Sequence, residues 1–165
     1  MKTPMKVVKK VACALLLLVL AALASLFIKE ALDTQDPEAA LPLIEVRCDG
    51  VLVPDTYRAA YQWNFFVTTE KREAQMIAVA DMPLVPMDVQ PSQAVNVAFS
   101  KTPQNLRVWR GEGRDTTSFT ELSGISPESA TTFYTPSTPG VYVYKVYGEW
   151  ARGNVLYYFA VEVKN

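Results

Sequence analysis

Histidine is absent from this chain, and cysteine occurs only twice, at Cys13 and Cys48. The lack of imidazole removes the commonest general base, the commonest zinc ligand and every serine or cysteine triad that depends on histidine. Paired carboxylates or a Ser–Lys dyad could still support an enzyme, but no spacing of these residues fits a recognised motif. We therefore predict no catalytic residue, no metal ligand and no cofactor, and we expect that the protein is not an enzyme.

The two cysteines do not predict a disulfide. Cys13 lies in an apolar run near the N-terminus, so Cys48 is the only cysteine in the rest of the chain. The fold must then rest on packing alone, and we expect Cys48 to be a buried strand residue. A free thiol or an intermolecular bridge at Cys48 is the alternative. Lipid attachment is poorly supported, because a lipid-bearing cysteine follows the apolar stretch, whereas Cys13 opens it.

Charge is missing from residues 11–28, where Ser25 is the only hydroxyl residue. At about 1.5 Å per residue, a helix of this length spans about 27 Å, which matches the hydrocarbon core of a bilayer. Four lysines precede this run, namely Lys2, Lys6, Lys9 and Lys10. By the positive-inside rule they keep the N-terminus in the cytoplasm and send the chain from residue 30 onward across the membrane. The sequence therefore predicts a single-pass cell-membrane protein with an extracytoplasmic C-terminal domain.

Two fates of this apolar segment remain open. Ala22-Leu23-Ala24 has the small-x-small form of a signal peptidase site, with cleavage before Ser25 and secretion of the rest. The apolar run continues past this site to Ile28 without Pro or Gly, which favours an uncleaved signal anchor. Both alternatives deliver the same domain to the outside.

The charges are distributed unevenly along the chain. Residues 1–30 hold five lysines and one acid, so the rest has 16 − 5 = 11 bases and 17 − 1 = 16 acids, a net charge of −5. A mildly acidic module argues against nucleic-acid binding, and we predict no nucleic-acid partner. About 135 residues remain after the segment, which is the size of one domain. We predict a signal anchor or signal peptide over 1–28, a polar stalk over 29–41 and an extracytoplasmic β-sandwich domain over 42–165.

Short stretches rich in Val, Tyr, Phe and Thr alternate with Pro, Gly, Asn and Asp from residue 43 onward, a pattern typical of all-β proteins. The predicted strands cover residues 43–47, 51–53, 60–68, 75–79, 94–99, 106–110, 117–122, 131–134, 141–150 and 155–163, with 75–79 the least clear. The last two have the clearest alternation and should form a central hairpin across a four-residue turn at 151–154. Strands at this spacing, each with one apolar face, favour an antiparallel β-sandwich of immunoglobulin-like type.

The C-terminal pattern also carries a resemblance. Pro139-Gly140-Val141-Tyr142-Val143-Tyr144 and the later Tyr157-Tyr158-Phe159, with the upstream Tyr61-Gln62-Trp63 and Leu106-Arg107-Val108-Trp109, are similar to small extracytoplasmic β domains of Gram-positive bacteria. Such domains occur as uncharacterised exported lipoproteins and as tails of membrane regulators that resemble the β-lactam sensor family. The resemblance implies fold and compartment over residues 43–165. It implies no site, because the matched positions are core and turn residues, and the chain lacks the lipid-bearing cysteine and any His-Glu-x-x-His.

Two groups of residues are candidates for a binding surface. Arg107, Trp109 and Arg110 form the most unusual polar-aromatic stretch, and Arg107 and Trp109 would share one strand face that could hold an anionic or sugar-like ligand. Tyr147 and Tyr158 lie opposite the inferred core faces of their strands and could form an exposed aromatic platform. The structural alternatives are a solubilised edge strand for the first group and a covered sheet face for the second.

These observations favour a non-enzymatic, membrane-tethered binding module of unknown ligand. Its partner would be a protein, a peptide or a cell-wall polymer, contacted through the Trp109 strand or through the apolar loop at residues 82–91. An extracytoplasmic protease inhibitor or regulatory subunit, acting by strand addition or loop insertion, is the alternative. A carboxylate-dependent hydrolase is a third hypothesis.

Overall fold

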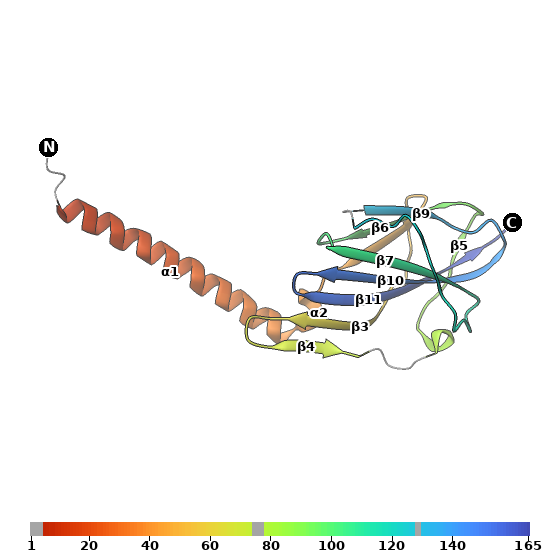
Figure 1. Ribbon diagram of the computed structural model, residues 1–165, viewed down its shortest axis with the longest axis horizontal. Coiled ribbons are helices and arrows are strands. Elements are labelled where there is room, and N and C mark those ends of the chain that lie inside the picture. The colour runs from red at the N-terminus through yellow and green to blue at the C-terminus, as the bar shows by residue number, and fades with distance from the viewer. Residues whose placement is uncertain (1–4, 74–77, 128–129) are drawn as a thin grey trace. The chain divides into compact units, whose positions relative to one another are not determined.

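The computed structural model describes residues 5–73, 78–127 and 130–165 of the chain (Figure 1). The chain separates into two compact units, Met1–Ala40 and Leu41–Asn165. The described part of the first unit is helical, and the second is built mainly from strands.

The N-terminal unit consists of two helices. Helix α1 covers Met5–Gln35 and the short α2 covers Pro37–Ala40, with the Asp36 carboxylate accepting a hydrogen bond of 3.3 Å from the Ala39 amide. The part of α1 from Val8 to Gln35 is long and apolar enough to cross a membrane, by length and composition. Because successive residues of a helix point about 100° apart, an amphipathic core helix would carry its apolar side chains on one stripe. Here Leu16, Leu17 and Leu18 are all exposed, so the helix is apolar on every side.

The C-terminal unit is a β-sandwich of two sheets, as predicted. The seven-stranded sheet has the order β4-β3-β11-β10-β7-β8, with β5 attached to β11, and the four-stranded sheet has the order β2-β1-β6-β9. Figure 1 shows β3, β11, β10 and β7 side by side, with β6 and β9 in the second layer. The strands are β1 (Ile44–Cys48), β2 (Val51–Leu52), β3 (Tyr57–Asn64), β4 (Thr69–Arg72), β5 (Met87–Val89), β6 (Ala94–Phe99), β7 (Asn105–Glu112), β8 (Thr120–Glu121), β9 (Ala130–Tyr134), β10 (Gly140–Trp150) and β11 (Gly153–Val163).

The predicted central hairpin is present as β10 and β11, which pair along their full length from Gly140↔Val163 to Trp150↔Gly153. The turn is shorter than predicted, because Gly153 and Asn154 belong to the strand and only two residues remain between the strands. Gly153 has a φ of 151°, and a Cβ there would lie 1.9 Å from the carbonyl oxygen of Gln62 in β3. Only glycine allows this approach, so Gly153 lets the turn pack directly on the neighbouring strand.

The main core lies between the two sheets. Alternate residues of β10 and β11 point inward, and Tyr144 and Phe159 are fully buried, as are Val46 and Val97 of the small sheet. Cys48 is also buried in β1, as expected, and is a free cysteine. The fold therefore rests on apolar packing.

A second, smaller core covers part of the outer face of the seven-stranded sheet. It is formed by buried residues from β3, β10 and β11 and from the segment after the 3₁₀ turn at Val79–Asp81, namely Ala59, Met82, Leu84, Val143, Tyr158 and Ala160. The guanidinium of Arg114 donates a hydrogen bond of 3.0 Å to the Leu84 carbonyl and holds this segment in place. Met82 and Leu84 of the predicted loop at 82–91 thus fold back on the sandwich, whereas Val85 is exposed, and the last part of the loop forms β5, parallel to β11.

The largest differences between the predicted strands and the structure occur at three places. The strand predicted over 60–68 is β3 followed by a tight reversal, where Phe65 N donates to the Thr68 carbonyl, and β4 then returns beside β3. The strand predicted over 117–122 is reduced to the two residues of β8. Most of the strand predicted over 75–79 lies outside the described residues, and Val79 begins the 3₁₀ turn.

Candidate functional site

The outer face of β7 and β10 brings several charged and aromatic side chains together. Residues paired across antiparallel strands point to the same face, and here Trp109 pairs with Lys145 of β10 on one side and with Glu121 of β8 on the other. Arg107 lies two residues before Trp109 and pairs with Tyr147. We call the set Arg107, Trp109, Glu121, Lys145 and Tyr147 the outer-face patch.

Two cations lie over the indole of Trp109. The guanidinium carbon of Arg107 is 4.6 Å from the ring centroid, and the ammonium nitrogen of Lys145 is 4.9 Å from it. Both distances are within the range of cation–π attraction. The indole is half-buried, so its cations remain at the surface of the sheet.

Arg107 is also held by a bidentate ion pair. Its Nε and Nη2 atoms donate to the two carboxylate oxygens of Glu121, each at 2.7 Å. This pairing raises the pKa of the Arg107 guanidinium and lowers the pKa of the Glu121 carboxyl. A planar fork against a carboxylate is the geometry that guanidinium favours, so Arg107 is fixed in orientation.

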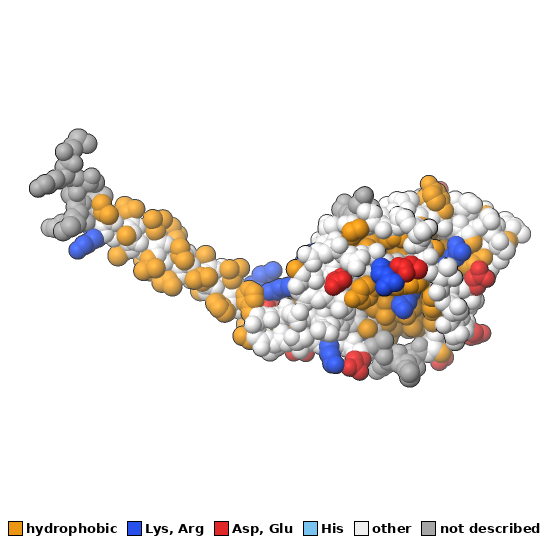
Figure 2. All heavy atoms as spheres, in the orientation of Figure 1, with side chains coloured by type: hydrophobic (Ala, Val, Ile, Leu, Met, Phe, Trp, Pro, Cys, Tyr) orange, Lys and Arg blue, Asp and Glu red, His pale blue; other side chains and the backbone are white. Residues whose placement is uncertain are grey.

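The patch is a small cationic area with an apolar surround. Figure 2 shows blue and red side chains side by side within a hydrophobic area over β7 and β10. Phe119 extends this area, with the Lys145 ammonium 6.0 Å from its ring centroid. The patch carries two cations and one anion, on a domain whose overall charge is negative.

The structure places three of the five predicted binding residues in the patch, namely Arg107, Trp109 and Tyr147. Arg110 points to the other face of β7, since it pairs with the buried Tyr144 and lies 5.8 Å from the ring of Tyr142. Alternation along the strand makes a common surface for Trp109 and Arg110 impossible.

Tyr158 is not part of an exposed platform with Tyr147. It is 9% exposed in the second core, with its ring 6.2 Å from that of Phe119, and its partner across the hairpin is Lys145. Burial raises the pKa of Tyr158. The alternative of a covered sheet face is therefore the correct one at this position.

Sequence reasoning missed Lys145 and Glu121 as members of the patch. Lys145 could have been predicted from the sequence, because it lies two residues before Tyr147 and the two therefore share one face of the strand. Glu121 did not, since only the pairing of the two-residue strand β8 with β7 brings it beside Trp109.

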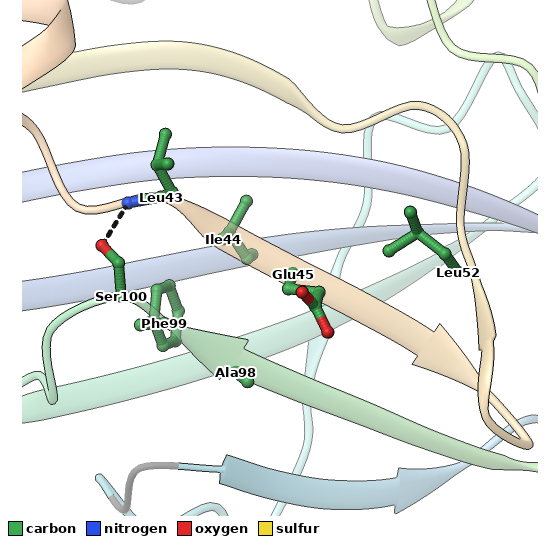
Figure 3. Close-up of a pocket in the computed structure, with 7 residues that line it drawn as sticks. All are labelled: Leu43, Ile44, Glu45, Leu52, Ala98, Phe99 and Ser100. Atoms are coloured by element: carbon green, nitrogen blue, oxygen red, sulfur yellow. Dashed lines mark hydrogen bonds between the residues drawn. The ribbon is translucent and has the colours of Figure 1, made fainter.

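A second candidate is a shallow hollow on the four-stranded sheet, with a volume of about 450 Å³. Figure 3 shows its lining along β1, β2 and β6, formed by Leu43, Ile44, Glu45, Leu52, Ala98, Phe99 and Ser100. Glu45 is the only ionisable residue among these, and its carboxylate is 2.6 Å from Arg47 Nε. The Ser100 hydroxyl accepts a hydrogen bond of 2.9 Å from the Leu43 amide. The hollow thus offers an apolar surface and gives Ser100 no adjacent base among its lining residues.

No protein-family model, curated protein or solved structure matches this chain. The resemblance to Gram-positive exported domains and the immunoglobulin-like type of the sandwich therefore stay predictions. Function has to be inferred from the chemistry of the site, because a fold alone does not specify one.

Proposed function

We propose that this protein is a non-enzymatic, membrane-anchored binding module whose folded domain lies outside the cytoplasmic membrane. Its partner is a protein that presents an acidic group to the outer-face patch. The observation that carries this proposal is the placement of Arg107 and Lys145 over Trp109 on an open sheet face. The ligand surface is a face of the sandwich rather than a cleft.

A binding role accounts for the chemistry of the patch better than catalysis does. Tryptophan, tyrosine and arginine are the residues that contribute most to protein–protein binding, and the patch contains all three within two adjacent strands. Its only carboxylate, Glu121, is occupied by Arg107. A glycosidase would need two acids about 5–10 Å apart across a substrate, and the patch supplies one.

The cations over Trp109 favour an acidic protein over a sugar polymer. A carbohydrate would stack on the face of the indole, where Arg107 and Lys145 already lie. An acidic side chain of a partner can instead bind Lys145 directly and compete with Glu121 for Arg107. The aromatic rings then supply the apolar contact around this ion pair.

The alternative of a protease inhibitor or regulatory subunit receives uneven support. Met82 and Leu84, the apolar side chains that loop insertion would use, are 7% and 4% exposed in the second core. Strand addition has a better basis, because β9 ends the small sheet and its five residues carry no charge. An uncharged edge strand can accept a further strand from a partner.

The anchoring part of the proposal rests on the N-terminal helix. Its length and composition suit a bilayer, and the lysines before residue 11 favour a cytoplasmic N-terminus. Both an uncleaved anchor and a cleaved signal remain open, and detection of residues 1–24 in the mature protein by mass spectrometry decides between them.

The test is photo-crosslinking of the full chain in its native membrane, with a photoreactive amino acid at Tyr147. The matched control carries the same group at Asn96, which lies on the outer face of the other sheet. We expect one protein to be captured from Tyr147 and not from Asn96, and we expect Trp109→Ala to remove it. Equal capture from both positions, or capture that survives Trp109→Ala, would overturn the proposal. Sedimentation of the chain with purified cell wall, abolished by the same substitution, would assign the patch to a polymer instead.

A further inference from the structure

The four-stranded sheet ends in a strand with an open outer edge. The order β2-β1-β6-β9 gives β9 a neighbour on one side only among the described strands (Figure 1). On that side, Ala130–Tyr134 pairs antiparallel with Ala94–Phe99, from Ala98↔Ala130 to Ala94↔Tyr134. An edge strand leaves a row of backbone N–H and C=O groups that can pair with a further strand.

The hydrogen bonds of β6 show which backbone groups of β9 lie at this edge. The Thr135 amide donates to the Gln93 carbonyl at 2.9 Å, so Thr135 faces β6, and so do the residues two and four positions before it. Backbone groups of successive residues in a strand point to alternate sides. Ala130, Thr132 and Tyr134 therefore direct their N–H and C=O groups away from β6, to the open edge.

The other edge strands of the described sandwich are protected against pairing. Three of the four residues of β4 are charged, namely Glu70, Lys71 and Arg72. Strands β2 and β8 have two residues each, and the short β5 carries Asp88. Charge and shortness are the devices by which natural edge strands avoid further strands. Strand β9 has neither, since its five residues, ATTFY, carry no charge and no proline and consist largely of good strand formers.

The exposed side chains of β9 favour an uncharged strand as the occupant. Thr132 is exposed and Tyr134 is 63% exposed, both on the outer face of the sheet. The Thr132 hydroxyl accepts a hydrogen bond of 3.1 Å from Asn96 Nδ2, so its own hydrogen is left to donate. A charged strand would find no counter-charge here. A second β9 brings the required composition, with no like charges to oppose the pairing.

Two copies of β9 also fit each other in register. Antiparallel pairing about a two-fold axis at Thr132 places Thr132 opposite its own copy and Tyr134 opposite Ala130. All three residues that face the edge then form hydrogen-bonded pairs, with about six backbone hydrogen bonds in total. A shift of the axis to Phe133 would place Ala130 opposite Pro136, which has no N–H to donate. The axis at Thr132 is therefore the favoured one, and it adds a cross-strand Thr–Thr pair.

We propose that two copies of this chain associate through β9, antiparallel about a two-fold axis at Thr132, so that their four-stranded sheets join into one continuous sheet. The interface is isologous and closes at two copies. This inference goes beyond the proposed function and does not depend on it, because the outer-face patch lies on the other sheet and stays free. A dimer presents two such patches, and a partner with two acidic sites would bind it with avidity.

Disulfide crosslinking of the full chain in mild detergent tests the register, in a background with Cys13→Ala. Thr132→Cys should give a disulfide-linked dimer on mild oxidation, because the Cα atoms of a hydrogen-bonded antiparallel pair lie about 5.5 Å apart. Tyr134→Cys is the matched control, since the register separates its two copies by about 14 Å along the strands, too far for a disulfide. A chain without an added cysteine measures the background from the buried Cys48.

Charge exchange at residue 132 tests whether the added strand is another β9. Copies of the chain carry two different affinity tags, and recovery of the second tag with the first measures association. Thr132→Lys in both copies, or Thr132→Glu in both, should lower the association constant about fivefold, because like charges then lie directly opposite each other. A lysine copy mixed with a glutamate copy should restore association to at least the original level.

The matched controls for charge exchange are Asn96→Lys and Asn96→Glu, on the same face of the neighbouring strand. They should leave association unchanged, because their copies lie two strands further apart. Thr132 is exposed, so its variants should keep their fold, and near-ultraviolet circular dichroism checks this.

The outcomes decide the proposal without reference to the outer-face patch, whose test uses Tyr147. Crosslinking at both cysteines, at Tyr134→Cys alone or at neither overturns it. Failure of the mixed charges to restore association overturns it as well, and so does association that is unchanged in both like-charged pairs, which would assign the contact to another part of the chain. Capture of a different protein by Thr132→Cys would show that a foreign strand occupies the edge, which also overturns the pairing of two copies.

Discussion

Tyr144 and Phe159 face each other across the central hairpin, with ring centroids 4.8 Å apart and ring planes 8° apart. Both side chains are fully buried between the sheets. The Tyr144 hydroxyl has no hydrogen-bond partner among the described residues, and its burial raises the pKa of this phenol. The centre of the core thus holds a polar group that contributes no hydrogen bond there.

Removal of this hydroxyl should stabilise the fold. We expect Tyr144→Phe to raise the free energy of unfolding by about 1 kcal/mol, because the desolvation cost of an unpaired hydroxyl disappears. Tyr157→Phe is the matched control, since it removes a hydroxyl that donates to the Pro42 carbonyl and should cost about 1 kcal/mol. Denaturant unfolding of the two variants measures both effects. A loss of stability in Tyr144→Phe would show that the hydroxyl is satisfied after all.

Gly153 should tolerate no side chain. We expect Gly153→Ala to cost at least about 3 kcal/mol, because the φ of 151° is strained for alanine and the Cβ meets the Gln62 carbonyl. Gly50 also has a positive φ, of 82°, but a Cβ there would have no neighbour within 4 Å, so Gly50→Ala should cost about 1 kcal/mol. The melting curve of Gly50→Ala reports backbone strain alone, and that of Gly153→Ala reports strain together with the clash of the Cβ with Gln62. Equal losses in the two variants would argue against the close approach of the turn to β3.

Cys48 should make stability depend on alkaline pH. Burial raises the pKa of its thiol to about 11, above the ordinary value near 9 in an unfolded chain. A raised pKa contributes its full stabilisation below the unfolded pKa and loses it as pH rises through the folded one. We therefore expect about 2–3 kcal/mol of stability to disappear between pH 9 and 11, at about 1.4 kcal/mol per pH unit.

The comparison that isolates this effect is Cys48→Ala. Buried tyrosines also titrate at high pH, so only the difference between the two unfolding curves reports on the thiol. The alanine variant is expected to be less stable at pH 7 and to have a flatter pH dependence above about pH 9. Parallel curves for the two proteins would refute the raised thiol pKa.

The second core can be tested at two adjacent residues. Leu84 is 4% exposed and Val85 is 63% exposed. We expect Leu84→Ala to cost about 2–4 kcal/mol and Val85→Ala less than about 0.5 kcal/mol, since only the first creates a cavity. Thermal unfolding of both variants gives the comparison. Similar small losses would mean that this segment does not cover the sheet in solution.

Glu121 should weaken partner binding by competing for Arg107. If the partner presents an acidic group, Glu121→Gln frees the guanidinium and should increase crosslinking from Tyr147, while Arg107→Gln should decrease it. Both residues are exposed, so we expect little change in unfolding free energy from either substitution. A decrease with Glu121→Gln would instead indicate a basic partner.

Local patterns of apolar and polar residues were enough to predict the fold class of this protein. The uncharged run at 11–28 is long enough to predict its helix, because helix length and side-chain polarity are properties of consecutive residues. The same holds for the alternation in 141–150 and 155–163, which assigns Tyr144 and Phe159 to the core side and Tyr147 to the other. The sandwich, the central hairpin and the burial of Cys48 followed from these periodicities.

Tertiary structure alone decided which residues share a surface. Trp109 lies between Lys145 and Glu121 because β7 pairs with β10 and β8 in one register, and no local pattern encodes the register of strands far apart in sequence. Tyr158 is buried because Met82 and Leu84, from a segment much earlier in the chain, fold over it. The Arg152 guanidinium lies over the ring of Phe66 for the same reason, since the pairing of β11 with β3, rather than the neighbours of either residue in sequence, brings the two turns together.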